Sequence, residues 1–315
     1  MARFVIRRLL AMALVLFAVS VLTFLIFNVI PNGDPAARMA GRQVTPTQVE
    51  AIRREWGFDQ PLYVQYANTM KKVFTGDLIS YSNRENVVDR IVDGAPRTFA
   101  LAIGAAILWF VAGVALGLFS AVRAGGVSDR VLTVLALIGI SMPVFWVGAL
   151  MNYYLGFKAG LFPNGGYIPF AENPLDWLYH LVLPWTALAL LFIGVYSRIL
   201  RSNVLDTVND DYVRTARAKG LTERRILLRH VLRNSLIPVV TLWGLDFGAV
   251  LGGGAILTET VFDLQGVGQY FAESISTLDQ PPVLAVVLFG AFFIVLLNTL
   301  VDIVYAALDP RIRLG

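Results

Sequence analysis

The chain has 315 residues, of which 57% are hydrophobic and only 15% charged, and its formal net charge is +4. Soluble globular chains contain about 45–50% apolar and about 25% charged residues, so this composition excludes an ordinary soluble domain and indicates a membrane protein. The chain has no cysteine, which excludes disulfides, thiolate metal sites and cysteine nucleophiles. The two histidines, His180 and His230, lie far apart in sequence, and we expect no catalytic, cofactor-binding or metal-ligating residue.

Six apolar runs along the chain are long enough to form membrane-spanning helices. A hydrocarbon core about 30 Å thick needs roughly 20 helical residues, and continuous apolar runs do not fit the alternating pattern of a transmembrane barrel. We therefore predict an all-α integral membrane protein with six transmembrane helices. The runs are Leu9–Ile30, Thr98–Val122, Val131–Phe157, Leu181–Ser197 with an extension back through Trp177, Asn234–Thr258 and Gln280–Val301.

The first apolar run follows Arg3, Arg7 and Arg8, so a cleaved signal peptide is an alternative to a first span. Signal peptides have an apolar segment of about 7–15 residues and a small-residue cleavage site. This run is 22 residues long and no clear site of that kind follows it, so we interpret it as a span. The chain then divides into residues 1–30, an external loop region over residues 31–96, and a five-span core over residues 97–315.

The external loop region of 66 residues carries eight basic and eight acidic residues, and it is long enough to cross the membrane whatever its charge. Within it, Gly57–Leu78 has apolar residues at helical spacing, and Pro61 suits a first helical turn. The spaced residues are Leu62, Tyr66, Met70 and Phe74. We expect a small cap that packs on the ends of the spans.

Lysine and arginine concentrate in the short cytoplasmic loops of membrane proteins, so their distribution predicts the orientation. The 198–233 loop carries nine basic residues, and others lie at the N-terminus, in the 123–130 turn and in the C-terminal tail at Arg311 and Arg313. On the opposite side, the 259–279 loop has four acidic residues and no basic one. Both termini and the 198–233 loop are therefore predicted to be cytoplasmic. Because the basic residues collect at the ends of spans, we expect no nucleic acid partner.

Local rules predict two short helices inside the 198–233 loop. Asn209 is a good N-cap, which places Asp210 and Asp211 in a first turn where carboxylates are favoured. Gly220 suits the left-handed position that ends a helix, and Thr222 suits the N-cap of the next one. On that second helix three arginines are expected to form one basic stripe at a spacing of four residues: Arg225, Arg229 and Arg233.

Two features inside the predicted spans need an explanation. Gly244, Gly248 and Gly252 permit close approach of another helix, either within the bundle or across a dimer interface, and the bundle is the more common use. Asp246 points about 200° away from Gly244 on a helical wheel, and a carboxylate in lipid needs water, a donor or a cation. We therefore expect Asp246 either to line a passage or to make a structural hydrogen bond. Asp302, near the end of the last span, is expected to pair with an arginine.

The segment YVRTARAKGLTERRILLRHVLRNSLIP (Tyr212–Pro238) resembles the coupling loop of ABC-importer permeases of the dipeptide and oligopeptide type. The general pattern of these permeases is Glu-Ala-Ala, three residues, Gly, nine residues, Ile, one residue, Leu-Pro. Ala216 and Gly220 occupy the second Ala and the Gly of this pattern. Arg214 and Thr215 replace its first two residues, and Arg-Thr-Ala-Arg-Ala-Lys-Gly is close to the variant of the peptide branch. Further along, Leu232 matches the Leu of the pattern, whereas His230 replaces its Ile and Arg233 replaces its Pro.

The resemblance implies a type I importer permease fold and a loop helix that fits a cleft on an ATPase subunit. The residues implied in this coupling contact are Asp211, Tyr212, Arg214, Thr215, Ala216, Arg217, Lys219 and Gly220. The segments ETVFDLQGVGQY (Glu259–Tyr270) and YAALDPRIR (Tyr305–Arg313) also look like those of peptide permeases. A contact with an external solute-binding protein is implied at Glu259, Asp263, Gly266 and Gly268.

The resemblance further implies a multi-pass permease in a prokaryotic cell membrane, without enzymatic activity of its own. Its partners would be a second homologous permease, usually a different chain, two ABC ATPase subunits that bind ATP and Mg, a solute-binding protein, and the peptide. Nickel chelates and glutathione are alternative cargoes. The competing class is a secondary transporter or channel working alone. The sequence has no Walker A pattern, no channel filter of the TVGYG type and no matched pair of broken helices, which favours the importer.

Overall fold

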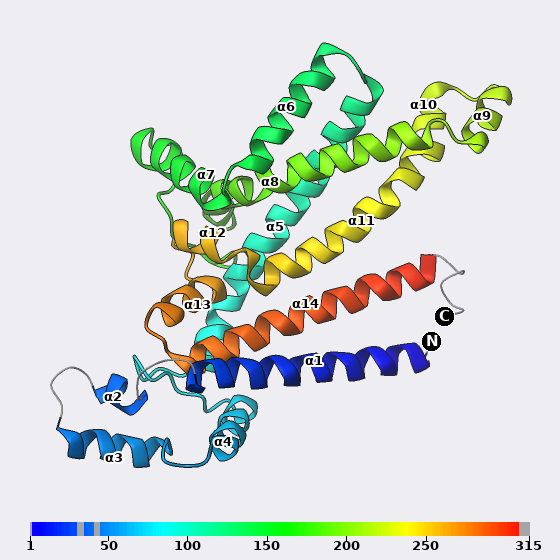
Figure 1. The fold of residues 1–315 in the computed structure, drawn as a ribbon. Helices are drawn as coiled ribbons and strands as arrows, with labels where there is room; N and C mark the ends of the chain where they lie inside the picture. Colours follow the sequence, from blue (N-terminus) through cyan, green and yellow to red (C-terminus); the bar gives the residue numbers. More distant parts are fainter. Residues whose placement is uncertain (1, 30–34, 41–44, 309–315) are drawn as a thin grey trace.

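The computed structural model describes residues 2–29, 35–40 and 45–308, and helices dominate these residues (Figure 1). Five helical segments are long and apolar enough to cross a membrane, or six if one sharply bent pair counts as a single span. The all-α prediction is confirmed. The main spanning helices are α1 (Ala2–Val29), α5 (Val87–Val122), α8 (Pro174–Thr207), α11 (Leu232–Ala249) and α14 (Gln280–Leu308).

The bent pair lies where the sequence predicts the third span, and this segment is sharply bent near its centre. The segment divides into α6 (Val127–Ser141) and α7 (Val144–Met151), which is extended by the π-helical turn η1 (Asn152–Lys158), and the two parts meet at 99°. Pro143 cannot donate a backbone hydrogen bond, and the residue before a proline is disfavoured in helical geometry. Met142 is extended accordingly, with φ −89° and ψ 131°. The arm formed by α7 and η1 consequently leaves the direction of α6 (Figure 1).

The external loop region forms three short helices at one end of the bundle: α2 (Pro35–Ala40), α3 (Pro46–Trp56) and α4 (Leu62–Thr75). The helix predicted after Pro61 is confirmed as α4. It packs on α1, because the Tyr66 hydroxyl shares a 2.7 Å hydrogen bond with Ser20 and the Tyr66 ring contacts Phe24 edge-on. Phe74 departs from the predicted packing face, since it is 87% exposed.

The core lies between α5 and α8, whose close contact depends on small residues of α5. A β-carbon on Gly104 would come within 2.0 Å of the Trp185 ring, and one on Gly113 within 2.6 Å of Tyr196. These absent side chains let α8 approach the α5 backbone, where the Trp185 indole donates a 2.9 Å hydrogen bond to the carbonyl of Ala100. In a membrane, this close van der Waals packing and the interhelical hydrogen bond stabilise the bundle.

The glycine stripe of α11 packs on α14 of the same chain. β-carbons on Gly244, Gly248 and Gly252 would meet residues along one face of α14, in the order Val301, Leu297 and Ile294. The prediction that this stripe serves packing within the bundle is confirmed. The expected partner of Asp302 is Arg8, and their ion pair joins α14 to α1. The final part of the predicted peptide-permease tail, with Arg311 and Arg313, lies outside the described residues.

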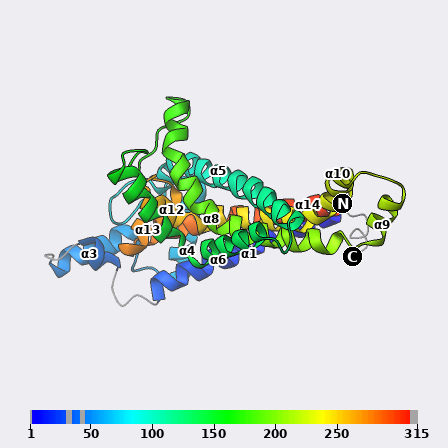
Figure 2. The same cartoon turned by 90° about the horizontal axis from the view of Figure 1, so that it is seen from above.

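The remaining helices occupy the two ends of an elongated bundle (Figure 2). At one end are α9 (Asp211–Ala218) and α10 (Glu223–Ile226), with the π-helical turn η2 (Leu227–Val231) leading into α11. At the other end, the π-helical turn η3 (Val250–Gly254) follows α11, and α12 (Ile256–Val261) and α13 (Val267–Ser276) lead to α14. The long spans therefore connect two separate groups of short helices.

Candidate functional site

The first candidate site is α9, the helix predicted between Asn209 and Gly220. Its N-cap is Asp210, with extended φ −65° and ψ 149°, so the predicted cap at Asn209 is one residue early. The Asn209 amide instead donates a 3.0 Å hydrogen bond to the carbonyl of Leu205 and belongs to the end of α8. The predicted left-handed conformation of Gly220 after this helix is confirmed, because its φ is +76° and its N–H donates to the Arg217 carbonyl at 2.9 Å.

The inner face of α9 is anchored to the start of the next span. Val213 and Ala216 are buried, and the Tyr212 hydroxyl accepts a 2.7 Å hydrogen bond from the Asn234 amide. Ala216 therefore packs inward, whereas the other residues predicted for the coupling loop are exposed. Val213 and Asn234 were not predicted, although the spacing of Val213 and Ala216 is the three-residue spacing of one helical face.

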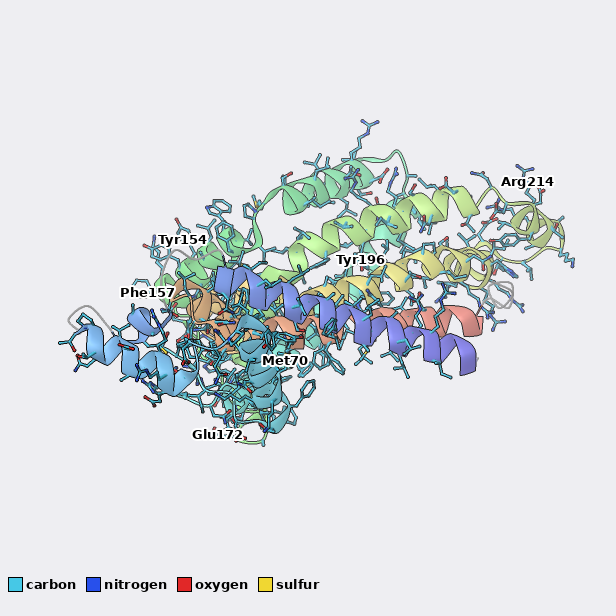
Figure 3. The ribbon with its side chains drawn as sticks, turned by 60° about the horizontal axis from the view of Figure 1, so that its bottom comes forward. Met70, Tyr154, Phe157, Glu172, Tyr196 and Arg214 are labelled. Carbon is cyan, nitrogen blue, oxygen red and sulfur yellow. The ribbon has the colours of Figure 1, made fainter. Side chains whose placement is uncertain are left out.

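The outer face of α9 is charged and exposed. The side chains of Arg214 and Asp211 are 69% and 97% exposed, and their contact of 3.4 Å is a weak surface ion pair. Arg214 lies at one tip of the molecule, while Tyr154 and Phe157 lie toward the other end and Tyr196 between them (Figure 3). The other exposed residues predicted for this site are Tyr212, Thr215, Arg217, Lys219 and Gly220.

The segment after Gly220 is less regular than predicted. Thr222 is the N-cap of α10, as expected, but no side-chain capping hydrogen bond forms there. The π-helical turn η2 interrupts the helix, so Arg225, Arg229 and Arg233 do not follow one regular α-helical stripe, although all three are exposed. The surface formed by these arginines lies beside α9, since the Arg217 guanidinium of α9 forms a 2.9 Å ion pair with Glu223 of α10.

The second candidate site is Asp246, on the α11 face that turns away from the glycine stripe. The Tyr196 hydroxyl of α8 donates a 2.7 Å hydrogen bond to an Asp246 carboxylate oxygen. Tyr196 itself is buried, and Asp246 is half-buried. The carboxylate therefore has a donor from a neighbouring span. The sequence did not reveal this donor, because Tyr196 reads as one more aromatic residue of an apolar helix.

The third candidate site is the segment Glu259–Tyr270, where the predicted contact surface needs correction. Glu259 of α12 is fully buried, so it cannot touch a docking protein in this conformation. Its carboxylate accepts hydrogen bonds from the Thr98 hydroxyl at 2.8 Å and from the backbone N–H of Gln269 at 2.9 Å. Burial raises the pKa of Glu259 to about 7. We call this cluster of Thr98, Glu259 and Gln269 the Glu259 knot.

The predicted glycines belong to the interior of the knot. A β-carbon on Gly266 would lie 2.4 Å from Oε2 of Glu259, and one on Gly268 would lie 3.0 Å from the same atom. Both glycines are buried, and of the four predicted contact residues only Asp263 is exposed. The Asp263 carboxylate accepts a 2.8 Å hydrogen bond from the Gln269 side chain, which ties this surface residue to the knot.

A second buried carboxylate at the same end was not predicted. Asp279 accepts hydrogen bonds from the Ser80 hydroxyl and from the backbone N–H groups of Tyr81 and Ser82, the latter two at 3.0 and 3.1 Å. It fastens the loop before α5 to the turn before α14. Among residues 2–29, 35–40 and 45–308, no three His, Asp or Glu side chains gather closely enough to hold a metal ion.

Comparison with known proteins finds one family over nearly the whole chain. Residues 113–314 match the binding-protein-dependent transport system inner membrane component family, and residues 1–102 match the N-terminal part of such components. A protein named as a peptide transport system permease in Brucella abortus (strain 2308) is 38% identical over 300 residues, 95% of either chain. The glutathione transport system permease GsiC of Escherichia coli K12 is 37% identical over 314 residues, 99% of either chain.

Proposed function

The chain belongs to the family of binding-protein-dependent transport system inner membrane components and is a permease subunit of an ABC importer, for which we propose a peptide cargo and coupling through α9. Its family implies ATPase and solute-binding partners and a place in a prokaryotic membrane. The finer proposals concern the cargo, the coupling helix, the docking face and Asp246. The anchored, outward-facing α9 is the observation that carries the coupling proposal.

The coupling proposal follows from how α9 is held. A helix that is to transmit force must be exposed on one face and fixed to the spans on the other. Arg214 and Asp211 supply the exposed face, while Val213 and the Tyr212–Asn234 hydrogen bond fix the helix to α11. Movement of an ATPase bound to the outer face would therefore displace the ends of α8 and α11. A second, homologous permease would bring a second such loop, which requires two ATPase subunits that bind ATP and Mg.

Charge reversal on the outer face tests the coupling proposal. We expect Arg214→Glu to leave the permease inserted and assembled, because this exposed side chain makes only a weak 3.4 Å ion pair with Asp211. The variant should lower substrate-stimulated ATP hydrolysis by about tenfold, equivalent to about 1.4 kcal/mol of activation free energy. The matched control is Arg130→Glu, an exposed arginine of α6 outside the loop. The assay uses the purified complex with its binding protein. Stimulation at the wild-type level in Arg214→Glu would remove the coupling role.

The predicted orientation is tested by labelling, since the chain has no native cysteine. Cysteines at the exposed positions Thr45 and Ser276 should react with an impermeant reagent in intact cells. A cysteine at Thr222, also exposed, should react only after permeabilisation. Labelling of Thr222→Cys from outside would place α9 on the wrong side for ATPases and would refute the coupling proposal.

The cargo proposal rests on the names of relatives. The Brucella protein is named for peptides and the Escherichia coli protein for glutathione, which is itself a tripeptide. Both names therefore refer to one chemical class, and the cargo we propose is a short peptide with a free amino group. Uptake of labelled dipeptides, longer peptides, glutathione and a nickel chelate by cells with and without the permease distinguishes these cargoes. Loss of nickel uptake alone would refute the peptide proposal.

The solute-binding protein is proposed to dock at the end opposite α9. The short helices α2, α3 and α4 lie at that end, and Asp263 is the exposed residue of the predicted contact set. Because the Glu259 knot lies directly behind Asp263, the role of Glu259, Gly266 and Gly268 in docking is to hold the surface in shape. Asp263 has φ +48° and accepts from Gln269, and asparagine suits both that φ and that hydrogen bond. Asp263→Asn should therefore weaken binding-protein affinity without lowering the yield of the complex, whereas unchanged affinity would exclude this contact.

For Asp246 we propose a structural tie to α8. The supporting observation is the 2.7 Å hydrogen bond from Tyr196, which satisfies a carboxylate that is otherwise costly in a membrane. Asp246→Asn keeps an acceptor for Tyr196, so uptake should remain normal, while Asp246→Leu should reduce the yield of the complex. The matched variant Tyr196→Phe removes the same hydrogen bond from the other side. If Asp246→Asn lowers uptake of free dipeptides but spares N-blocked ones, Asp246 instead lines the passage.

A further inference from the structure

A cavity of about 580 Å³ is lined by residues of α6 and α8. These two helices lie apart from α1 and α14 (Figure 1). One part of its wall is apolar and comes from Ile140, Val195 and Ile199. The other part carries two guanidinium groups, those of Arg198 and Arg201. The cavity therefore has one apolar wall and one positively charged end. Its lining residues belong to none of the three candidate sites.

Only one of the two arginines brings an uncompensated charge. Arg201 forms two hydrogen bonds with Asp129, at 2.7 and 2.9 Å, and Asp129 also accepts from the Ser120 hydroxyl. Arg198 is exposed, and among the described residues no carboxylate lies within 4.0 Å of its guanidinium. The cavity thus presents a fixed ion pair with a net positive charge beside it.

Arg198 lies at the level where the protein leaves the apolar part of the membrane. It is the first charged residue after the apolar run Leu181–Ser197. The α5–α6 turn at residues 123–126 lies close by, because Arg201 pairs with Asp129 of the first turn of α6. Arginines at the ends of spans extend their charge to the headgroup region while their stems stay in apolar surroundings.

We propose that this cavity binds an acidic phospholipid, with the phosphate on Arg198 and an acyl chain along the wall of Ile140, Val195 and Ile199. Basic pockets between transmembrane helices near the membrane surface are suited to acidic headgroups. A guanidinium binds phosphate through two parallel hydrogen bonds. The polar residues Thr133 and Ser202 line the same cavity. The bound lipid would join α6 to α8 where α8 continues toward α9.

The test compares lipid binding by two arginine variants of the purified, assembled complex in detergent. Arg198→Gln removes the proposed ligand, and Arg130→Gln removes an exposed arginine from the same end that does not line the cavity. Phosphatidylglycerol and phosphatidylcholine with identical acyl chains are added, and bound lipid is counted by native mass spectrometry. We expect wild type and Arg130→Gln to prefer phosphatidylglycerol and Arg198→Gln to lose about tenfold in affinity for it. Arg198→Lys should recover part of that loss.

Four results would overturn the proposal. The first is equal binding of both lipids by wild type, and the second is an equal loss in Arg198→Gln and Arg130→Gln. The third is displacement of phosphatidylglycerol by soluble glycerol phosphate at similar concentration, which would indicate a site for a free anion. A cysteine at Arg198 that crosslinks to the partner permease would also contradict it, because the cavity would then belong to an interface between subunits.

Discussion

The two ends of this permease use glycine and carboxylate residues for opposite purposes. At the α9 end, Gly220 has φ +76° and an added β-carbon would meet nothing within 4 Å, so glycine is needed there for backbone conformation. At the other end, Gly266 has an ordinary φ of −82°, but a β-carbon would collide with Glu259 and Thr98. Glycine is needed there for space.

The carboxylates differ in the same way. Asp211 of α9 is almost fully exposed and pairs loosely with Arg214 at 3.4 Å. Glu259 is fully buried and joins α12, α13 and α5 through hydrogen bonds of 2.8 and 2.9 Å. One end therefore exposes its charged side chains, while the other uses a charge-bearing residue as an internal tie. Substitutions at the α9 end should affect coupling, and those at the Glu259 knot should affect stability.

The largest expected effect is that of Gly266→Ala. Its β-carbon would lie 2.4 Å from Glu259 Oε2 and 2.7 Å from Thr98 Oγ1, so the knot must open, at a cost of about 1–3 kcal/mol. The purified complex should unfold at a lower Tm, and the yield of complex from purification should also be lower. Gly220→Ala is the matched control, because it strains an exposed turn by about 1 kcal/mol without a collision and should lower the Tm by less than Gly266→Ala does.

The comparison breaks down if Gly220→Ala lowers the Tm as much as Gly266→Ala does. A second variant tests the steric explanation directly. Adding Glu259→Ala to Gly266→Ala removes the carboxylate that the new methyl group would strike. The double variant should then lose less stability than the sum of the two single variants, since the two residues share one contact.

The second expected effect is a pH dependence between about pH 5 and pH 8 that arises from Glu259. The folded pKa of Glu259 is about 7, against 4.5 for the free side chain, so between these values the folded state keeps a proton that the unfolded chain has released. Stability should therefore fall as pH rises from about 5 to about 8. Glu259→Gln, which stays neutral, should flatten this part of the Tm profile.

The matched control for the pH experiment is Glu223→Gln at the α9 end, where the side chain is 71% exposed. Its profile should follow that of wild type over the whole range. A wild-type Tm that does not change between these pH values, or a Glu259→Gln profile as steep as wild type, would show that Glu259 is not the titrating group.

The smallest expected effect concerns the ion pair between Arg217 and Glu223, which closes the loop after α9. Both side chains are substantially exposed, and such surface pairs contribute less than about 1 kcal/mol. Arg217→Gln should change the Tm by no more than a degree or two at moderate salt. A loss of stability as large as that of Gly266→Ala would mean that the α9 end is not the loosely held end.

Local properties of the chain determined much of this description. Long apolar runs predict spans because backbone groups in lipid must bond internally, and all but one of these runs form continuous spanning helices. Gly220 was predictable because a left-handed residue after a helix selects glycine. The N-cap was missed by one position, since Asn209 and Asp210 are nearly equal as caps and their backbone decides between them.

The features that only the tertiary structure decided join residues that are distant in sequence. Glu259 looked like a surface residue of an acidic loop until Thr98, 161 positions earlier, proved to donate to it. Asp246 had no visible partner until α8 placed Tyr196, 50 positions earlier, beside it. Hydropathy and turn chemistry act over a few residues, whereas the burial of a carboxylate depends on which distant donor the packed helices bring within about 3 Å.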